Sequence, residues 1–82
     1  MMNTMSQTEF ETTMETIAAG MVHNGTLKKG LTKEIVERAI LKYFPIFRYE
    51  HILTVYYGGA PVEYTISRVN WKLGRFIEKL IA

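Results

Sequence analysis

Residues 49–61 read YEHILTVYYGGAP, and the fold depends on how this stretch is interpreted. Residues 52–57 are rich in β-branched and aromatic side chains, which favour strands, and a glycine pair follows them. The apolar side chains nevertheless recur at positions 49, 52, 53, 56 and 57, which is the spacing of one helix face, whereas strand alternation would divide them between two faces. We therefore interpret 49–57 as a helix that ends at the glycines. The alternative that stays open is an α+β fold with a hairpin at 52–67.

The chain before this stretch begins with a clear helix signal. Ser6 and Glu9 have the spacing of a capping box, in which each side chain satisfies an unpaired backbone donor at the start of a helix. Apolar residues then recur every three or four positions until Asn24-Gly25, a pair that favours a left-handed helix end. We expect a flexible stretch at 1–6 and a helix over 7–23.

Two further helices follow from the same kind of pattern. Thr32 is a suitable N-cap for a helix over 33–44, which Pro45 ends because proline disfavours helical backbone in the residue before it. The longest apolar periodicity runs over 61–81 and predicts a helix to the end of the chain. Gly74 lies inside it, so we expect either a close backbone contact or a break in the helix there.

Length and composition fit one small domain over residues 1–82. The four predicted helices make it a compact all-α four-helix domain. A chain of 82 residues buries little surface, and with no cysteine it has no disulfide to stabilise it, so we expect a homodimer. The sequence contains neither a secretory leader nor a long apolar run, which indicates a cytoplasmic protein that does not enter a membrane.

Positive charge is concentrated near the end of the chain. Residues 1–41 carry four bases and five acids, whereas residues 42–82 carry six bases and three acids. On a helical wheel, four of these bases fall within a band of about 60° opposite the apolar face of the last predicted helix. We call them the basic stripe; they are Arg68, Lys72, Arg75 and Lys79. Tyr64, Thr65 and Trp71 flank the stripe, and this mixture of cations, hydroxyls and flat rings suits nucleic acid.

A short helix, a tight turn and a longer basic helix over 49–81 resemble the helix-turn-helix and winged-helix superfamily of DNA-binding domains. The resemblance covers about 33–81, and residues 64–73, YTISRVNWKL, are similar to its recognition helices. It implies that the last helix enters the major groove, with Tyr64, Thr65, Arg68 and Lys72 nearest the base edges and with phosphate contacts from Arg75, Lys79, Arg48, Lys28 and Lys29. Two residues depart from the pattern. Trp71 is large for a base-reading position, and the alternatives are that it packs under the domain or wedges against sugar and phosphate. Glu63 would repel phosphate unless it accepts from a cytosine amino group.

These features predict a DNA-binding regulatory or accessory protein, active in transcription regulation, that recognises duplex DNA without doing chemistry. The alternative is a small protein-interaction module or inhibitor, for example of the phage type, because a basic stripe also suits an acidic partner protein. An enzyme is not expected: the chain lacks aspartate, a phosphate-binding glycine loop and a nucleophile motif. His23 and His51 have no predicted partners, so we expect no metal and no cofactor.

Overall fold

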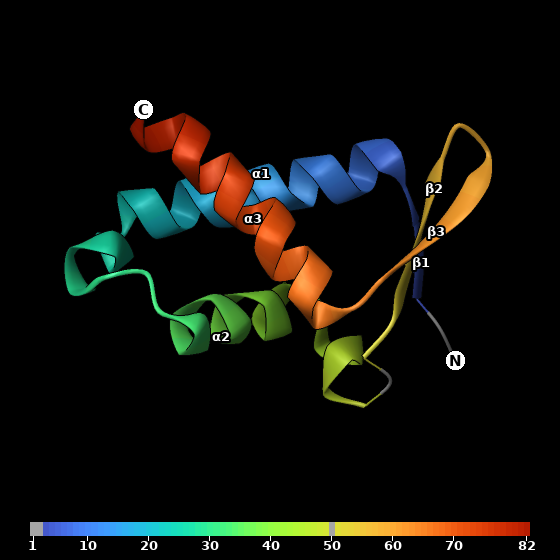
Figure 1. Ribbon diagram of the computed structural model, residues 1–82, viewed down its shortest axis with the longest axis horizontal. Coiled ribbons are helices and arrows are strands. Elements are labelled where there is room, and N and C mark those ends of the chain that lie inside the picture. The colour runs from blue at the N-terminus through green and yellow to red at the C-terminus, as the bar shows by residue number, and fades with distance from the viewer. Residues whose placement is uncertain (1–2, 50) are drawn as a thin grey trace.

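The computed structural model describes residues 3–49 and 51–82, and for Asn3 and Lys29 it describes the backbone alone. The described part of the chain is mixed α+β, with three α-helices, two short 3-10 helices and a three-stranded sheet (Figure 1). The elements in chain order are β1 (Asn3–Ser6), α1 (Gln7–His23), η1 (Thr26–Lys29), α2 (Lys33–Tyr43), η2 (Pro45–Arg48), β2 (Leu53–Tyr57), β3 (Ala60–Tyr64) and α3 (Ile66–Ile81). The predicted all-α four-helix fold is therefore wrong.

The first helix is the element that the sequence describes best. α1 has the predicted bounds, and the backbone N–H of Glu9 donates to Ser6 Oγ at 3.2 Å, as a capping residue requires. At the other end Gly25 adopts a left-handed φ of +70°, which lets the chain leave the helix. Ahead of α1, the stretch that we expected to be flexible contributes β1 over residues 3–6.

The second helix also begins as predicted. The backbone N–H of Ile35 donates to Thr32 Oγ1 at 3.3 Å, and α2 then runs to Tyr43, one residue short of the predicted end. Pro45 does not lead into an open loop, because it occupies the first position of η2, where its fixed φ suits a helical turn.

The described residues of the stretch 49–61 contain no helix and form most of a hairpin. β2 and β3 are antiparallel, with Tyr57 opposite Ala60. The turn between them consists of Gly58 and Gly59 at φ +60° and +83°, and two left-handed residues in succession are what a tight type I′ turn needs. The hairpin of the alternative interpretation is thus present over 53–64, and the predicted helix over 49–57 is wrong.

The burial of individual side chains in this stretch follows the strand and not the helical spacing. Tyr49 belongs to the proposed helix face but is 78% exposed, whereas Val55, which lies off that face, is fully buried. Leu53, Thr54 and Val55 are all buried in succession, as expected for a strand covered on both faces. β2 is the central strand, because β1 pairs with it in parallel on the side opposite β3.

The last helix starts later than predicted. Residues 60–64 form β3, and Pro61 is tolerated there because β3 is an edge strand with one side free of sheet hydrogen bonds. α3 is continuous through Gly74, and a Cβ built on that glycine would meet nothing within 4 Å. Neither the close contact nor the break expected at Gly74 is present.

The core lies where α1, α3 and the sheet meet. In Figure 1 α3 crosses in front of α1, and α2 lies below α1. The hairpin extends to one side of the helices. The largest fully buried side chains come from every layer; they include Phe10, Phe44, Phe47, Met14, Ile17, Ile40, Leu53, Leu73 and Ile77.

Candidate nucleic-acid interface

α3 separates its apolar and basic residues as the helical wheel predicts. Val69, Leu73 and Ile77 are buried in the core and fix the helix by one face. On the opposite face the basic stripe reaches solvent: Arg68, Arg75 and Lys79 are exposed, and Lys72 is half-buried. The cations therefore lie on a rigid element with their charged groups available to a ligand.

Trp71 lies within this basic face and does not pack under the domain. Its side chain is 60% exposed. Lys72 Nζ lies 5.7 Å from the centroid of the indole ring, and Arg75 Cζ lies 5.3 Å from it. Both distances are within the range of cation–π attraction, which is worth about 0.5–1 kcal/mol at an exposed site. Two members of the stripe thus contact the exposed indole.

Tyr64 lies at the border of the basic face and is largely buried. It is the last residue of β3, only 7% exposed, and its ring is stacked against Phe10 of α1. The sequence led us to expect an exposed base-contacting side chain here, whereas most of this ring supports the core. The edge of Tyr64 forms part of a hollow of about 330 Å³ beside the first turns of α3, which Ser67, Arg68 and Trp71 also line.

The hollow brings in one residue that the sequence interpretation missed. Ser67 is exposed and supplies a hydroxyl next to Arg68 and Trp71. Its wheel position, about 40° from Trp71, would have identified it.

The remaining predicted contacts lie at different distances from α3. Thr65 is the exposed N-cap residue of α3, and Arg48 is exposed on η2. Lys28 is exposed on η1, which Figure 1 shows at the opposite end of the molecule from the hairpin. The side chain of Lys29 lies outside what the structure describes. The structure therefore groups the stripe, Trp71 and Thr65, and leaves Lys28 apart from them.

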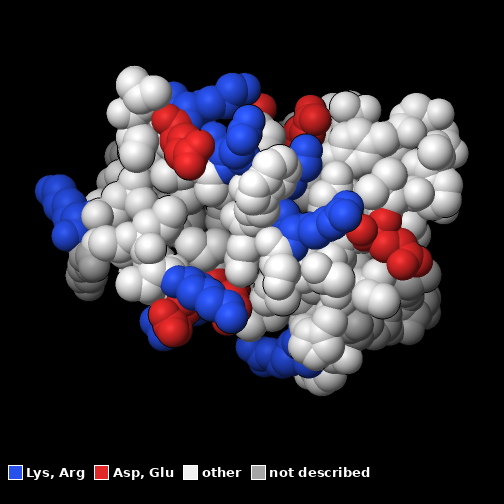
Figure 2. All heavy atoms as spheres, in the orientation of Figure 1, with Lys and Arg blue, Asp and Glu red and all other residues white. Residues whose placement is uncertain are grey.

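Within residues 3–49 and 51–82 no carboxylate forms an ion pair with the basic stripe. The ion pair present in this part of the chain is Lys33–Glu37 on α2, at 3.7 Å. Figure 2, in the orientation of Figure 1, shows Lys and Arg side chains from the centre toward the upper left, over the course of α3, with acidic groups at a few points beside them. The hairpin that precedes α3 contains no Lys or Arg and carries Glu63, so it is not a phosphate-binding wing.

The described residues hold no other obvious site of chemistry. No group of three or more His, Cys, Asp or Glu side chains in that part of the chain is placed to hold a metal ion. Likewise, no helix within 3–49 or 51–82 is both long and apolar enough to cross a bilayer. Comparison of the chain with protein-family models, characterised proteins and solved structures found no match.

Proposed function

We propose that this protein binds duplex DNA through the basic stripe of α3 and acts by recognition, without catalysis. The observation that carries the proposal is the exposed, unpaired set of cations around Trp71 on one rigid helix face. α3 has 16 residues and is therefore about 24 Å long, enough to lie along a major groove about 12 Å wide. The element that precedes α3 in the chain is the β2–β3 hairpin and not the first helix of a helix-turn-helix.

Each member of the face has a role that its chemistry suits. Arg68, in the first turn of α3 and beside the hollow, donates to guanine or phosphate. Arg75 and Lys79 neutralise phosphates further along the helix. The indole of Trp71 packs against sugars at the groove edge, where a flat apolar surface excludes water.

A single short helix reads few base pairs, so a specific regulator of this size is expected to act as a homodimer on two half-sites. Light scattering of the free and DNA-bound protein tests this part separately. A regulatory role in transcription and a cytoplasmic location belong to the same proposal.

The proposal is tested by anisotropy of a fluorescein-labelled duplex at several salt concentrations. If the four cations each neutralise one phosphate, log K should fall with log salt with a slope of about −3.6. Arg68→Ala and Arg75→Ala should each lower affinity and reduce the slope by about 0.9. The matched control is Lys33→Ala, which removes one exposed cation from α2 and should leave both values unchanged.

Two outcomes would overturn the DNA proposal. One is the absence of duplex binding at low salt; the other is an equal effect of Lys33→Ala and Arg75→Ala. The second candidate function, binding of an acidic protein, is favoured by the exposed Trp71 beside Arg68 and Arg75, because Trp and Arg dominate the centres of protein interfaces. Binding of a Glu-rich model peptide without duplex binding would support this candidate.

A further inference from the structure

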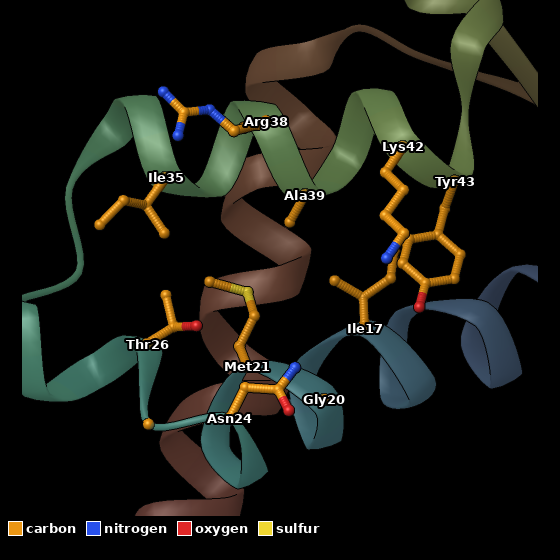
Figure 3. A pocket seen from close by; sticks show the side chains of 11 residues that line it. Ile17, Gly20, Met21, Asn24, Thr26, Ile35, Arg38, Ala39, Lys42 and Tyr43 are labelled. Atoms are coloured by element: carbon orange, nitrogen blue, oxygen red, sulfur yellow. The ribbon is translucent and has the colours of Figure 1, made fainter.

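α1 and α2 both pack on α3 but leave an open space between themselves. This space, which we call the α1–α2 groove, has a volume of about 500 Å³. Figure 3 shows it between the two helices, with α3 behind them. Its lining comes from α1, η1 and α2 and from the short connections beside them; it consists of Ile17, Gly20, Met21, Asn24, Gly25, Thr26, Ile35, Arg38, Ala39, Lys42 and Tyr43. The volume lies within the range of small-molecule sites, about 300–1,000 Å³.

Small residues keep the groove open. Gly20 lies in the interior of α1, where glycine destabilises a helix by about 1 kcal/mol relative to alanine. Close packing does not account for this residue, because a Cβ at Gly20 would meet nothing within 4 Å. On α2 the lining includes a second small helical residue, Ala39. A larger side chain at either position would occupy the space.

The chemistry of the lining is divided between apolar and cationic groups. Ile17, Met21, Ile35 and Ala39 supply an apolar surface, and each is at least partly buried. Two cations of α2, Arg38 and Lys42, also line the groove, and none of its described lining residues is acidic. Within the described residues neither cation is paired with a carboxylate. The groove therefore favours a ligand that carries negative charge as well as apolar surface.

Lys42 and Tyr43 lie together at one end of the groove. Figure 3 shows the side chains of Lys42 and Tyr43 both extending from α2 toward α1, while Arg38 extends away from the centre of the space. Lys42 Nζ lies 5.8 Å from the centroid of the Tyr43 ring, so the ammonium group and the phenol ring are neighbours at this end of the groove. Together they offer a charged donor and a hydroxyl donor to one anionic group.

We propose that the α1–α2 groove binds a small amphipathic carboxylate. The carboxylate accepts hydrogen bonds from Lys42 and the Tyr43 hydroxyl, and the apolar body covers Met21, Ile35 and Ala39. The site shares no residue with the basic stripe, so it does not depend on the proposed DNA binding.

The test uses decanoate as the probe and decan-1-ol as its neutral match, with NMR of methyl-labelled protein. We expect decanoate, below its micelle concentration, to shift the methyl signals of Ile17, Met21 and Ile35. It should bind at least about tenfold more tightly than decan-1-ol, because a charge-assisted hydrogen bond contributes about 1.5–3 kcal/mol. Lys42→Met keeps the apolar stem and should abolish this preference while leaving decan-1-ol binding unchanged.

Two further variants make the result specific to the groove. Lys33→Met makes the same change on α2 outside the lining and should retain the preference. Ala39→Leu should fill the space and weaken both probes, with circular dichroism as the check that the fold persists. The proposal is overturned if decanoate leaves these methyl groups unshifted, or if Lys42→Met retains the preference. It is also overturned if the methyl signals depend on protein concentration alone, since the groove would then be a surface between two copies of the chain.

Discussion

The ring of Tyr64 stacks on the ring of Phe10, with centroids 4.9 Å apart and planes inclined by 28°. Phe10 is fully buried in the second turn of α1, and Tyr64 is the last residue of the sheet before α3. The pair therefore joins the sheet to the helices at the point where the basic helix begins. Such contacts add about 0.5–1.5 kcal/mol to the free energy gained from burial.

Tyr64→Ala should accordingly act on stability and not on recognition. Loss of a buried aromatic ring lowers the free energy of unfolding by about 3–5 kcal/mol, whereas Tyr64→Phe keeps the stacked ring and should change it little. Urea unfolding followed by circular dichroism measures both. A Tyr64→Ala variant that kept wild-type stability but lost a ligand would show that the tyrosine is a contact residue after all.

The hairpin turn predicts a position where alanine is harmful. Gly59 has φ +83°, a conformation that L side chains avoid at a cost of about 1–2 kcal/mol. Gly59→Ala should therefore lower the free energy of unfolding by about that amount. An unchanged midpoint in thermal unfolding would argue against the left-handed turn.

The same substitution should have the opposite effect in the helices. Gly20 and Gly74 have helical backbone and free space around their missing Cβ atoms. Gly20→Ala and Gly74→Ala should each stabilise the protein by up to about 1 kcal/mol, because alanine restricts the unfolded chain and favours the helix. These variants are the matched controls for Gly59→Ala, and a destabilising result at either would mean that its helix packs more closely than described.

Alkaline unfolding should depend on Tyr57. Burial, and after it the neighbouring Tyr64, raise the pKa of the Tyr57 hydroxyl above its ordinary value near 10. The folded protein thus keeps this proton at a pH where the unfolded chain releases it, so the stabilising contribution is complete below about pH 10 and is lost as the pH rises further. In Tyr57→Phe the free energy of unfolding should fall less steeply above pH 10 than in the wild type. Tyr56→Phe, on the exposed neighbouring residue, should show the wild-type slope.

Local signals predicted the starts of α1 and α2. Ser6 and Thr32 begin α1 and α2 as expected, because N-capping depends on one side chain and a backbone N–H three residues away. The basic stripe was also predictable, because a wheel needs only the helical repeat and a buried opposite face.

Non-local interactions explain what could not be predicted. The apolar spacing of residues 49–57 favours a helix, yet residues 53–57 form a strand that pairs with β1, a partner from the other end of the chain. Asn3-Thr4-Met5-Ser6 has no alternating pattern that would reveal it. The α1–α2 groove was missed for a similar reason: Gly20, Lys42 and Tyr43 come together only through the way two helices pack on a third.

The parallel pairing of β1 with β2 also constrains how the chain reaches its fold. Asn3 pairs with Leu53, and α1 and α2 lie between these two residues in the sequence. The loop to be closed is therefore long, and its conformational entropy is lost before the stabilising contact forms. The hairpin of β2 and β3 closes over two residues, and we expect its amide protons to gain protection first in pulse-labelling hydrogen exchange. The four residues of β1 would then dock last. Until they do, one edge of the central strand remains open to any other chain, and the rate of this final docking, more than the stability of the finished domain, would determine how readily the newly made protein aggregates.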